Sequence, residues 1–148
     1  MAVVLDANIP IRFAIGRKVP RLLTGYAETV DFLTPDTAFA EARLNLPIML
    51  ESRGYAGAGV TAALAALESA AEIVTVVPAS SYVSMRTAAV ARIGPRDADD
   101  WPVLAGALML KCPIWTEDRD FFGVGMPIWT TSLVELYFTD TDPGMAAE

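Results

Sequence analysis

Carboxylates at four separated places are the residues of this chain best suited to carry chemistry. Each stands where an apolar segment ends, or where a helix begins or turns. Acids at the ends of buried strands can converge, and converged carboxylates repel each other until a cation neutralises them. The sequence therefore predicts a metal site with oxygen ligands. The acids concerned are Asp6, Glu41, the run Asp97, Asp99 and Asp100, and the pair Asp118 and Asp120.

The absence of histidine from the chain narrows the chemistry further. It excludes a Ser-His-Asp triad, a Cys-His pair and an HExxH zinc site. The single cysteine, Cys112, lies beside an apolar stretch, and we expect it to be a small buried hydrophobe. Any reaction must therefore use carboxylates, hydroxyls, Lys and Arg, or a hard metal ion.

Composition indicates a single compact domain. The chain has 148 residues, of which 53% are hydrophobic, so it can bury a substantial core. No apolar run reaches the roughly 18–20 residues that a membrane span needs, and we expect a soluble cytoplasmic protein. The net charge of −7 argues against a general nucleic-acid binder but not against a nuclease whose metal ligands are acidic.

The elements that must position these acids follow from the hydrophobic pattern. Short β-branched runs alternate with longer helical segments, which predicts βαβ units and a parallel sheet. We expect the chain to kink or break at Pro47 and to fray from Thr139 onward. The expected strands cover residues 2–5, 30–33, 73–77, 114–116 and 128–130, and the expected helices cover 9–15, 20–28, 36–53, 61–71, 80–93, 99–111 and 132–138.

Placement at strand ends gives the first and last acids their expected roles. Ligands of open parallel sheets bind beyond the carboxyl ends of the strands, where Asp6 and Asp118 stand. Alternate residues of an extended segment point to one side, so Asp118 and Asp120 are expected to share a site. Polar groups expected to contact substrate are the Asn8 amide, the Thr116 hydroxyl and, on a basic rim facing phosphates, Arg12.

Two of the acids lie within a helix or at its start. Glu41 lies in an Ala-rich helix, where either a metal ion or Arg43 would compensate its charge. Trp101-Pro102 fixes the entry of the next helix, so Asp100 is expected to point back toward the sheet edge. Spacing alone leaves Asp97 and Asp99 as alternatives to Asp100.

Taken together, these segments resemble the PIN-domain family. The resemblance runs from about Val3 to Tyr137, and its last two segments are the more specific. The segments are Leu5-Asp6-Ala7-Asn8, the helical Glu41, Arg96-Asp97-Ala98-Asp99-Asp100-Trp101-Pro102-Val103-Leu104-Ala105 and Trp115-Thr116-Glu117-Asp118-Arg119-Asp120-Phe121-Phe122-Gly123.

The resemblance implies a three-layer α/β/α sandwich around a mainly parallel sheet over residues 1–138, followed by a flexible tail over 139–148. It also implies a hydrolase that cleaves RNA phosphodiester bonds with Mg²⁺ or Mn²⁺. Many such proteins resemble the toxins of VapBC-type toxin–antitoxin pairs, which act as homodimers silenced by a small antitoxin. The alternative is a catalytically weak module of the same fold that works by binding a partner protein.

Carried over residue by residue, the resemblance gives four acids catalytic roles. The third role goes to Asp100, because the apolar positions after it match those of the family. The catalytic set is Asp6, Glu41, Asp100 and Asp118, and the metal-ligand set is Asp6, Asp100, Asp118 and Asp120.

Overall fold

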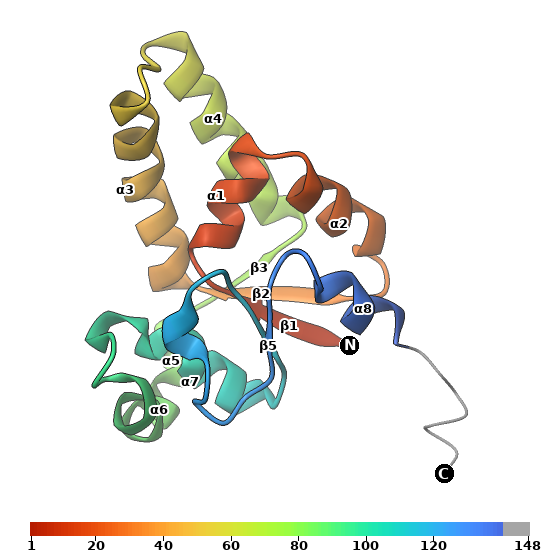
Figure 1. Cartoon of the computed structure of the whole chain (residues 1–148), viewed down its shortest axis with the longest axis vertical. Helices are drawn as coiled ribbons and strands as arrows, with labels where there is room; N and C mark the ends of the chain where they lie inside the picture. The colour runs from red at the N-terminus through yellow and green to blue at the C-terminus, as the bar shows by residue number, and fades with distance from the viewer. Residues whose placement is uncertain (141–148) are drawn as a thin grey trace.

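A parallel five-stranded sheet forms the centre of the protein (Figure 1). The computed structural model describes residues 1–140. Most of the tail expected over 139–148 therefore lies outside the described residues. The strands are β1 (Ala2–Leu5), β2 (Asp31–Pro35), β3 (Thr75–Val77), β4 (Ile114–Trp115) and β5 (Ile128–Trp129).

The strand order is β3-β2-β1-β4-β5, and every neighbouring pair is parallel. In β1, Val3, Val4 and Leu5 are buried, as expected for a strand covered on both faces. The chain winds from β1 outward to β3, then crosses back to place β4 on the other side of β1. The order therefore reverses between β1 and β4, where open α/β sheets bind ligands.

Helices cover both faces of the sheet, which confirms the three-layer prediction (Figure 1). One apolar core joins the sheet to α5, α6 and α7, and a second joins it to α1, α2 and α8. A third packs α3 and α4 together and against α1. The helices are α1 (Asn8–Ile15), α2 (Lys18–Tyr26), α3 (Asp36–Ser52), α4 (Ala58–Ser69), α5 (Ala79–Tyr82), α6 (Arg86–Ile93), α7 (Trp101–Leu110) and α8 (Val134–Thr139).

Two helical segments differ from the sequence prediction. α3 runs through Pro47, so of the expected kink or break the break does not occur. The helix expected over 80–93 is divided into α5 and α6 by a 3₁₀ turn over Val83–Met85. The buried Tyr82 donates a hydrogen bond of 2.5 Å to Asp36. This bond holds α5 against the start of α3, a contact that α6 does not share.

Cys112 is buried, as expected. Burial raises the pKa of its thiol to about 11, so it remains a neutral core group near neutral pH. Across residues 1–140, no helix combines the length and apolarity that crossing a membrane requires.

Candidate metal centre

Asp6 anchors the site at the carboxyl end of β1. Its backbone N–H donates to the Trp115 carbonyl at 3.1 Å, which extends the pairing of β1 with β4. Asp6 is 5% exposed, and its carboxylate accepts hydrogen bonds from the Ala7 N–H at 2.8 Å and from the Thr116 hydroxyl at 2.7 Å. Burial raises the pKa of Asp6 despite these bonds, and the charge of Asp118 adds to the effect.

Thr116 and Asn8 cross-link the ends of β1 and β4. The Thr116 hydroxyl, which is buried, donates to Asp6 and accepts from the Asp118 N–H at 2.9 Å. The Asn8 amide donates to Asp6 at 3.0 Å and accepts from the Glu117 N–H at 3.3 Å. These bonds hold the acids of two strands in a fixed relation, a positioning role for both polar groups.

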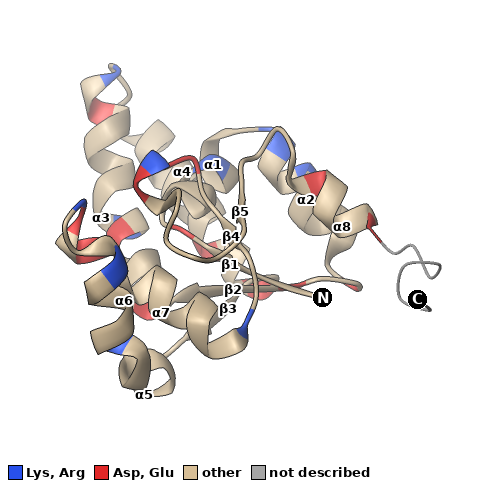
Figure 2. Ribbon diagram, turned by 60° about the horizontal axis from the view of Figure 1, so that its bottom comes forward, with Lys and Arg blue, Asp and Glu red and all other residues tan. Residues whose placement is uncertain are grey.

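Four aspartates meet beside this cross-link. Asp97, Asp100, Asp118 and Asp120 each offer a carboxylate oxygen, and these oxygens lie within 4.8 Å of one another. We call these four residues the aspartate cluster. Glu41 of α3 lines the same hollow as Asp97, Asp100 and Asp118, and Figure 2 shows red, acidic segments gathered beside α3.

Two similar turns build the aspartate cluster. Asp97 accepts a hydrogen bond from the Asp99 N–H at 2.9 Å and so caps the 3₁₀ turn that leads into α7. Asp118 accepts from the Asp120 N–H, also at 2.9 Å, and caps the 3₁₀ turn after β4. Each turn therefore fixes its first aspartate through the backbone and brings a second carboxylate to the cluster.

Asp100 gives the clearest indication that this cluster suits a cation. Its Oδ2 is buried and, among the residues that the structure describes, has no hydrogen-bond partner. Burial, together with the charges of Asp6, Asp97 and Asp118, raises its pKa to about 8. A buried unpaired carboxylate is costly. Hard oxygen donors at this spacing fit a divalent ion such as Mg²⁺ or Mn²⁺, which would compensate that cost.

Glu41 approaches the same place from α3. Desolvation raises the pKa of this carboxyl group, followed by the charges of Asp6 and Asp97. Arg43 does not compensate it, because the Arg43 Nε donates to Glu68 at 2.5 Å. Of the two groups that the sequence allowed to neutralise Glu41, a metal ion or Arg43, the geometry therefore favours a metal ion.

All four acids predicted as catalytic line one hollow of about 170 Å³, which we call the acidic pocket. Asp97 and Asn8 line it as well. The structure thus brings Asp6 and Asp118 together although they lie more than 100 positions apart in the sequence. The acids that line it are Asp6, Glu41, Asp97, Asp100 and Asp118.

The predicted metal-ligand set overlaps the aspartate cluster at Asp100, Asp118 and Asp120. Asp6 borders the same pocket but lies outside the cluster, whose fourth member is Asp97. Asp99, the other alternative for the third role, instead lines a small neighbouring recess. The roles of the individual residues remain predictions.

Arg12 and two residues to which the sequence prediction gave no role, Asn45 and Arg96, complete the description. Arg12 is exposed and lines a hollow next to the acidic pocket. Asn45 lines the acidic pocket one helical turn after Glu41, a spacing that identifies it as a neighbour on the same helix face. Arg96 holds the loop after β4 by donating to the carbonyls of Asp120 and Phe122. Arg96 begins one of the segments that resemble the family, but its role could not be predicted, because its partners are backbone atoms.

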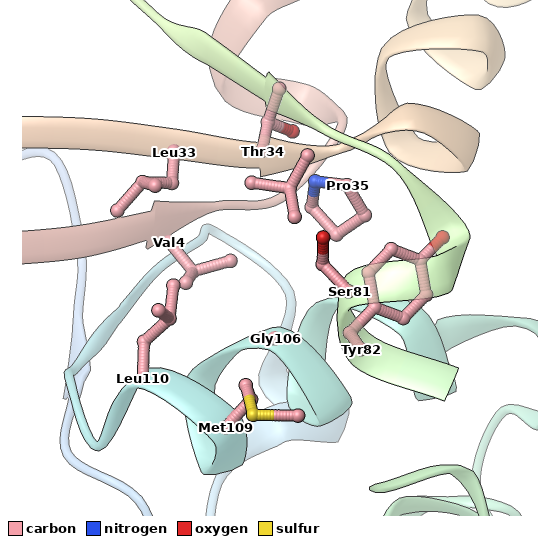
Figure 3. A pocket seen from close by; sticks show the side chains of 10 residues that line it. Val4, Leu33, Thr34, Pro35, Ser81, Tyr82, Gly106, Met109 and Leu110 are labelled. Atoms are coloured by element: carbon pink, nitrogen blue, oxygen red, sulfur yellow. The ribbon is translucent and has the colours of Figure 1, made fainter. Parts of the chain in front are cut away.

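A separate apolar hollow of about 180 Å³ lies between the sheet and α7 (Figure 3). Val4, Leu33 and Leu110 line it, and Gly106 of α7 faces it without a side chain. None of the acids described above borders this hollow.

Comparison with known proteins identifies the family. A family model described as PIN domain matches residues 4–139, nearly the whole described chain. The protein therefore belongs to the PIN domain family. None of the curated proteins compared matches the chain.

Solved structures share the fold at low sequence identity. VapBC2 from Rickettsia felis, bound to a DNA fragment from its promoter, matches with a TM-score of 0.64 and 11% identity, over 88% of this chain and 98% of that one. FitAcB from Neisseria gonorrhoeae matches with a TM-score of 0.59 and 20% identity, over 88% and 98% of the two chains. FitAB bound to the IR36 DNA fragment has a TM-score of 0.57 and 20% identity, over 87% and 94%.

Proposed function

We propose that this protein is a divalent-metal-dependent endoribonuclease and the toxin of a toxin–antitoxin pair. The observation that carries the proposal is the buried, unpartnered Oδ2 of Asp100 within the aspartate cluster, at the point where the strand order reverses. Membership of the PIN domain family supports the same reading, since nuclease activity is general in that family.

The aspartate cluster would hold Mg²⁺ or Mn²⁺ through carboxylate oxygens. Such an ion supplies a Lewis acid for the phosphate and lowers the pKa of water. Asp6 adds negative charge at the end of β1. The Thr116 hydroxyl holds the Asp6 carboxylate beside Asp118 by bonding to both residues. Glu41, whose pKa is raised, is placed to accept a proton at the rim of the acidic pocket. Arg12 provides a cation for the RNA backbone next to that pocket.

Exposed apolar side chains support a protein partner. On α3, Leu44 is 70% exposed and Ile48, one turn later, is 66% exposed. Leu136 of α8 is 61% exposed. Such side chains favour burial against another chain. With the likeness to VapBC2 and FitAB, this supports a small antitoxin partner and a homodimer acting on RNA in the cytoplasm.

The same exposed apolar side chains favour the second candidate, a catalytically weak PIN-domain module that acts by binding a partner. The two candidates differ in what they require of the aspartate cluster. A nuclease needs its carboxylates for metal binding, whereas an interaction module does not.

Asp118→Asn tests the proposal. We expect loss of Mg²⁺-dependent RNA cleavage by more than about 100-fold, because this change removes a charged ligand at the centre of the cluster. Calorimetric Mg²⁺ binding should weaken in parallel, while circular dichroism stays that of the folded protein. Asp31→Asn is the matched control, since Asp31 is exposed at the start of β2, the opposite end of the sheet from the acidic pocket.

Equal cleavage by Asp118→Asn and the unmodified protein would overturn the assignment. A wild-type protein that neither binds Mg²⁺ or Mn²⁺ nor cleaves RNA would leave the interaction module as the function.

A further inference from the structure

The acidic pocket opens into a groove that follows α1. Asn8 and Ile11 line both the acidic pocket and a second hollow of about 480 Å³, which also includes Arg12 and Arg53. Arg53 then joins this second hollow to a third, of about 390 Å³, that includes Tyr55. We call the second and third hollows together the α1 groove.

Two cations without partners line the α1 groove. Arg12 and Arg53 are both exposed, and within residues 1–140 neither side chain forms an ion pair or a hydrogen bond. Arg21 and Arg43 pair with glutamates, whereas Arg17, in this range, does not, so Arg12 and Arg53 differ from other unpaired cations by their position in the groove. In a chain of net charge −7, two free guanidinium groups beside an acidic pocket favour an anionic ligand that passes both of them.

The remaining lining suits nucleobases. Ile11, Ile15 and Met49 line the second hollow, and Tyr55, which lines the third, is 55% exposed. Bases stack on exposed aromatic rings irrespective of sequence, but only when they are unpaired. A groove that combines phosphate-binding cations with an open aromatic ring therefore selects a single strand over a duplex.

The length of α1 sets the size of the bound segment. Its 8 residues span about 12 Å at about 1.5 Å per residue. At the rise of about 3.4 Å per nucleotide of a stacked strand, this corresponds to roughly three nucleotides. Tyr55 would thus meet a base about three positions from the phosphate held in the acidic pocket.

We propose that single-stranded RNA lies in the α1 groove on one side of the scissile phosphate, with Arg12 and Arg53 contacting its phosphates and Tyr55 stacking on a base. This inference rests on the proposed ribonuclease function, because it takes the substrate of the acidic pocket to be RNA. The chemically different occupant, an acidic peptide of a protein partner, is distinguished by the test below.

Binding in EDTA tests the groove separately from catalysis. A fluorescent ten-nucleotide single-stranded RNA is titrated with the full chain carrying Arg53→Gln or Tyr55→Ala, and the dissociation constant is read by anisotropy. Arg21→Gln is the matched control, because it removes the same charge from an exposed helix position outside the groove.

We expect each groove variant to weaken RNA binding about tenfold and Arg21→Gln to leave it within about twofold. Removing Arg53 should also reduce the slope of log K against log salt by about 0.7, the value for one phosphate contact on a single strand. Tyr55→Ala should not change the weaker binding of a duplex of the same sequence.

The outcomes separate the two proposals. Groove-dependent RNA binding by a protein that shows no metal-dependent cleavage would remove the proposed function but support the groove. Cleavage that depends on Asp118, with RNA binding indifferent to Arg53 and Tyr55, would overturn the groove alone. Groove variants that lose binding of a poly-glutamate peptide but keep that of RNA would overturn it in favour of a protein ligand.

Discussion

Replacing Asp100 with asparagine should stabilise the metal-free protein and remove its response to Mg²⁺. Asp100 Oδ2 is buried without a hydrogen-bond partner in the described part of the chain. Burial and the charges of Asp6, Asp97 and Asp118 raise its pKa from 3.8 to about 8. Near neutral pH, folding without a metal ion must therefore either take up a proton or bury an uncompensated charge.

The size of the effect depends on pH. Because the native state holds the Asp100 proton more tightly than the unfolded chain, its contribution is fully favourable below pH 3.8 and is lost as the pH rises toward about 8. At pH 7 the loss spans about three pH units, or at most about 4 kcal/mol at about 1.4 kcal/mol per unit. Asp100 is partly exposed, so solvent screening reduces this to about 1–2 kcal/mol.

Thermal unfolding of the wild-type protein and Asp100→Asn measures this difference. In EDTA at about pH 7.5, a gain of 1–2 kcal/mol corresponds to a rise of roughly 3–6 °C in Tm for a chain of this size. At about pH 4.5 most of the difference should vanish. Added Mg²⁺ should raise the Tm of the wild type alone. If Asp100→Asn lowered the Tm in EDTA equally at both pH values, the carboxylate would not be the uncompensated charge inferred here.

Two further changes test the fold around the site. Gly106→Ala should raise the free energy of unfolding in urea by about 0.5–1 kcal/mol, because alanine favours the helix. The new Cβ would lie 3.9 Å from both γ-carbons of Val4, which lines the apolar hollow of Figure 3. A lower urea midpoint would contradict this packing. Asp36→Asn should cost about 1–2 kcal/mol at neutral pH by weakening the bonds to Tyr82 and Ala79. The Tyr82 hydroxyl is the main group that lowers the pKa of Asp36, so the stability that Asp36 contributes is present above pH 3.8 and lost as the pH falls below it. If the urea midpoints of the two proteins stayed apart down to about pH 2, this pH dependence would be refuted.

The layered fold was predictable because its signals are local and strong. The apolar run Ala2–Leu5 lacks alternation, which is possible only for a strand covered on both faces. Parallel strands of that kind place whatever follows them at one edge of the sheet, so Asp6 and Asp118 were expected at the same edge. The pairing of β1 with β4, which brings the two residues together, could not be predicted from the sequence alone.

Details of the turns were not predictable from spacing. Asp118 and Asp120 share a site as expected, but the reason is a 3₁₀ turn capped by Asp118 and not an extended segment. The same kind of turn brings both Asp97 and Asp100 to the aspartate cluster, whereas only one of these acids was predicted to be a ligand. Capping by a side chain two residues away changes which groups face each other, and no periodicity in the sequence records it.

Electrostatics links the stability of this protein to its proposed substrate. Asp6, Glu41 and Asp100 all have raised pKa values, with burial as the leading cause and the other acids of the pocket as contributors. The repulsion that disfavours their ionisation also acts on an RNA phosphate, so a metal-free pocket weakens, without abolishing, the binding of RNA to the adjoining Arg12 and Arg53. A bound divalent ion would relieve both repulsions at once. Metal binding is thus expected to favour folding and substrate entry through the same neutralised charge.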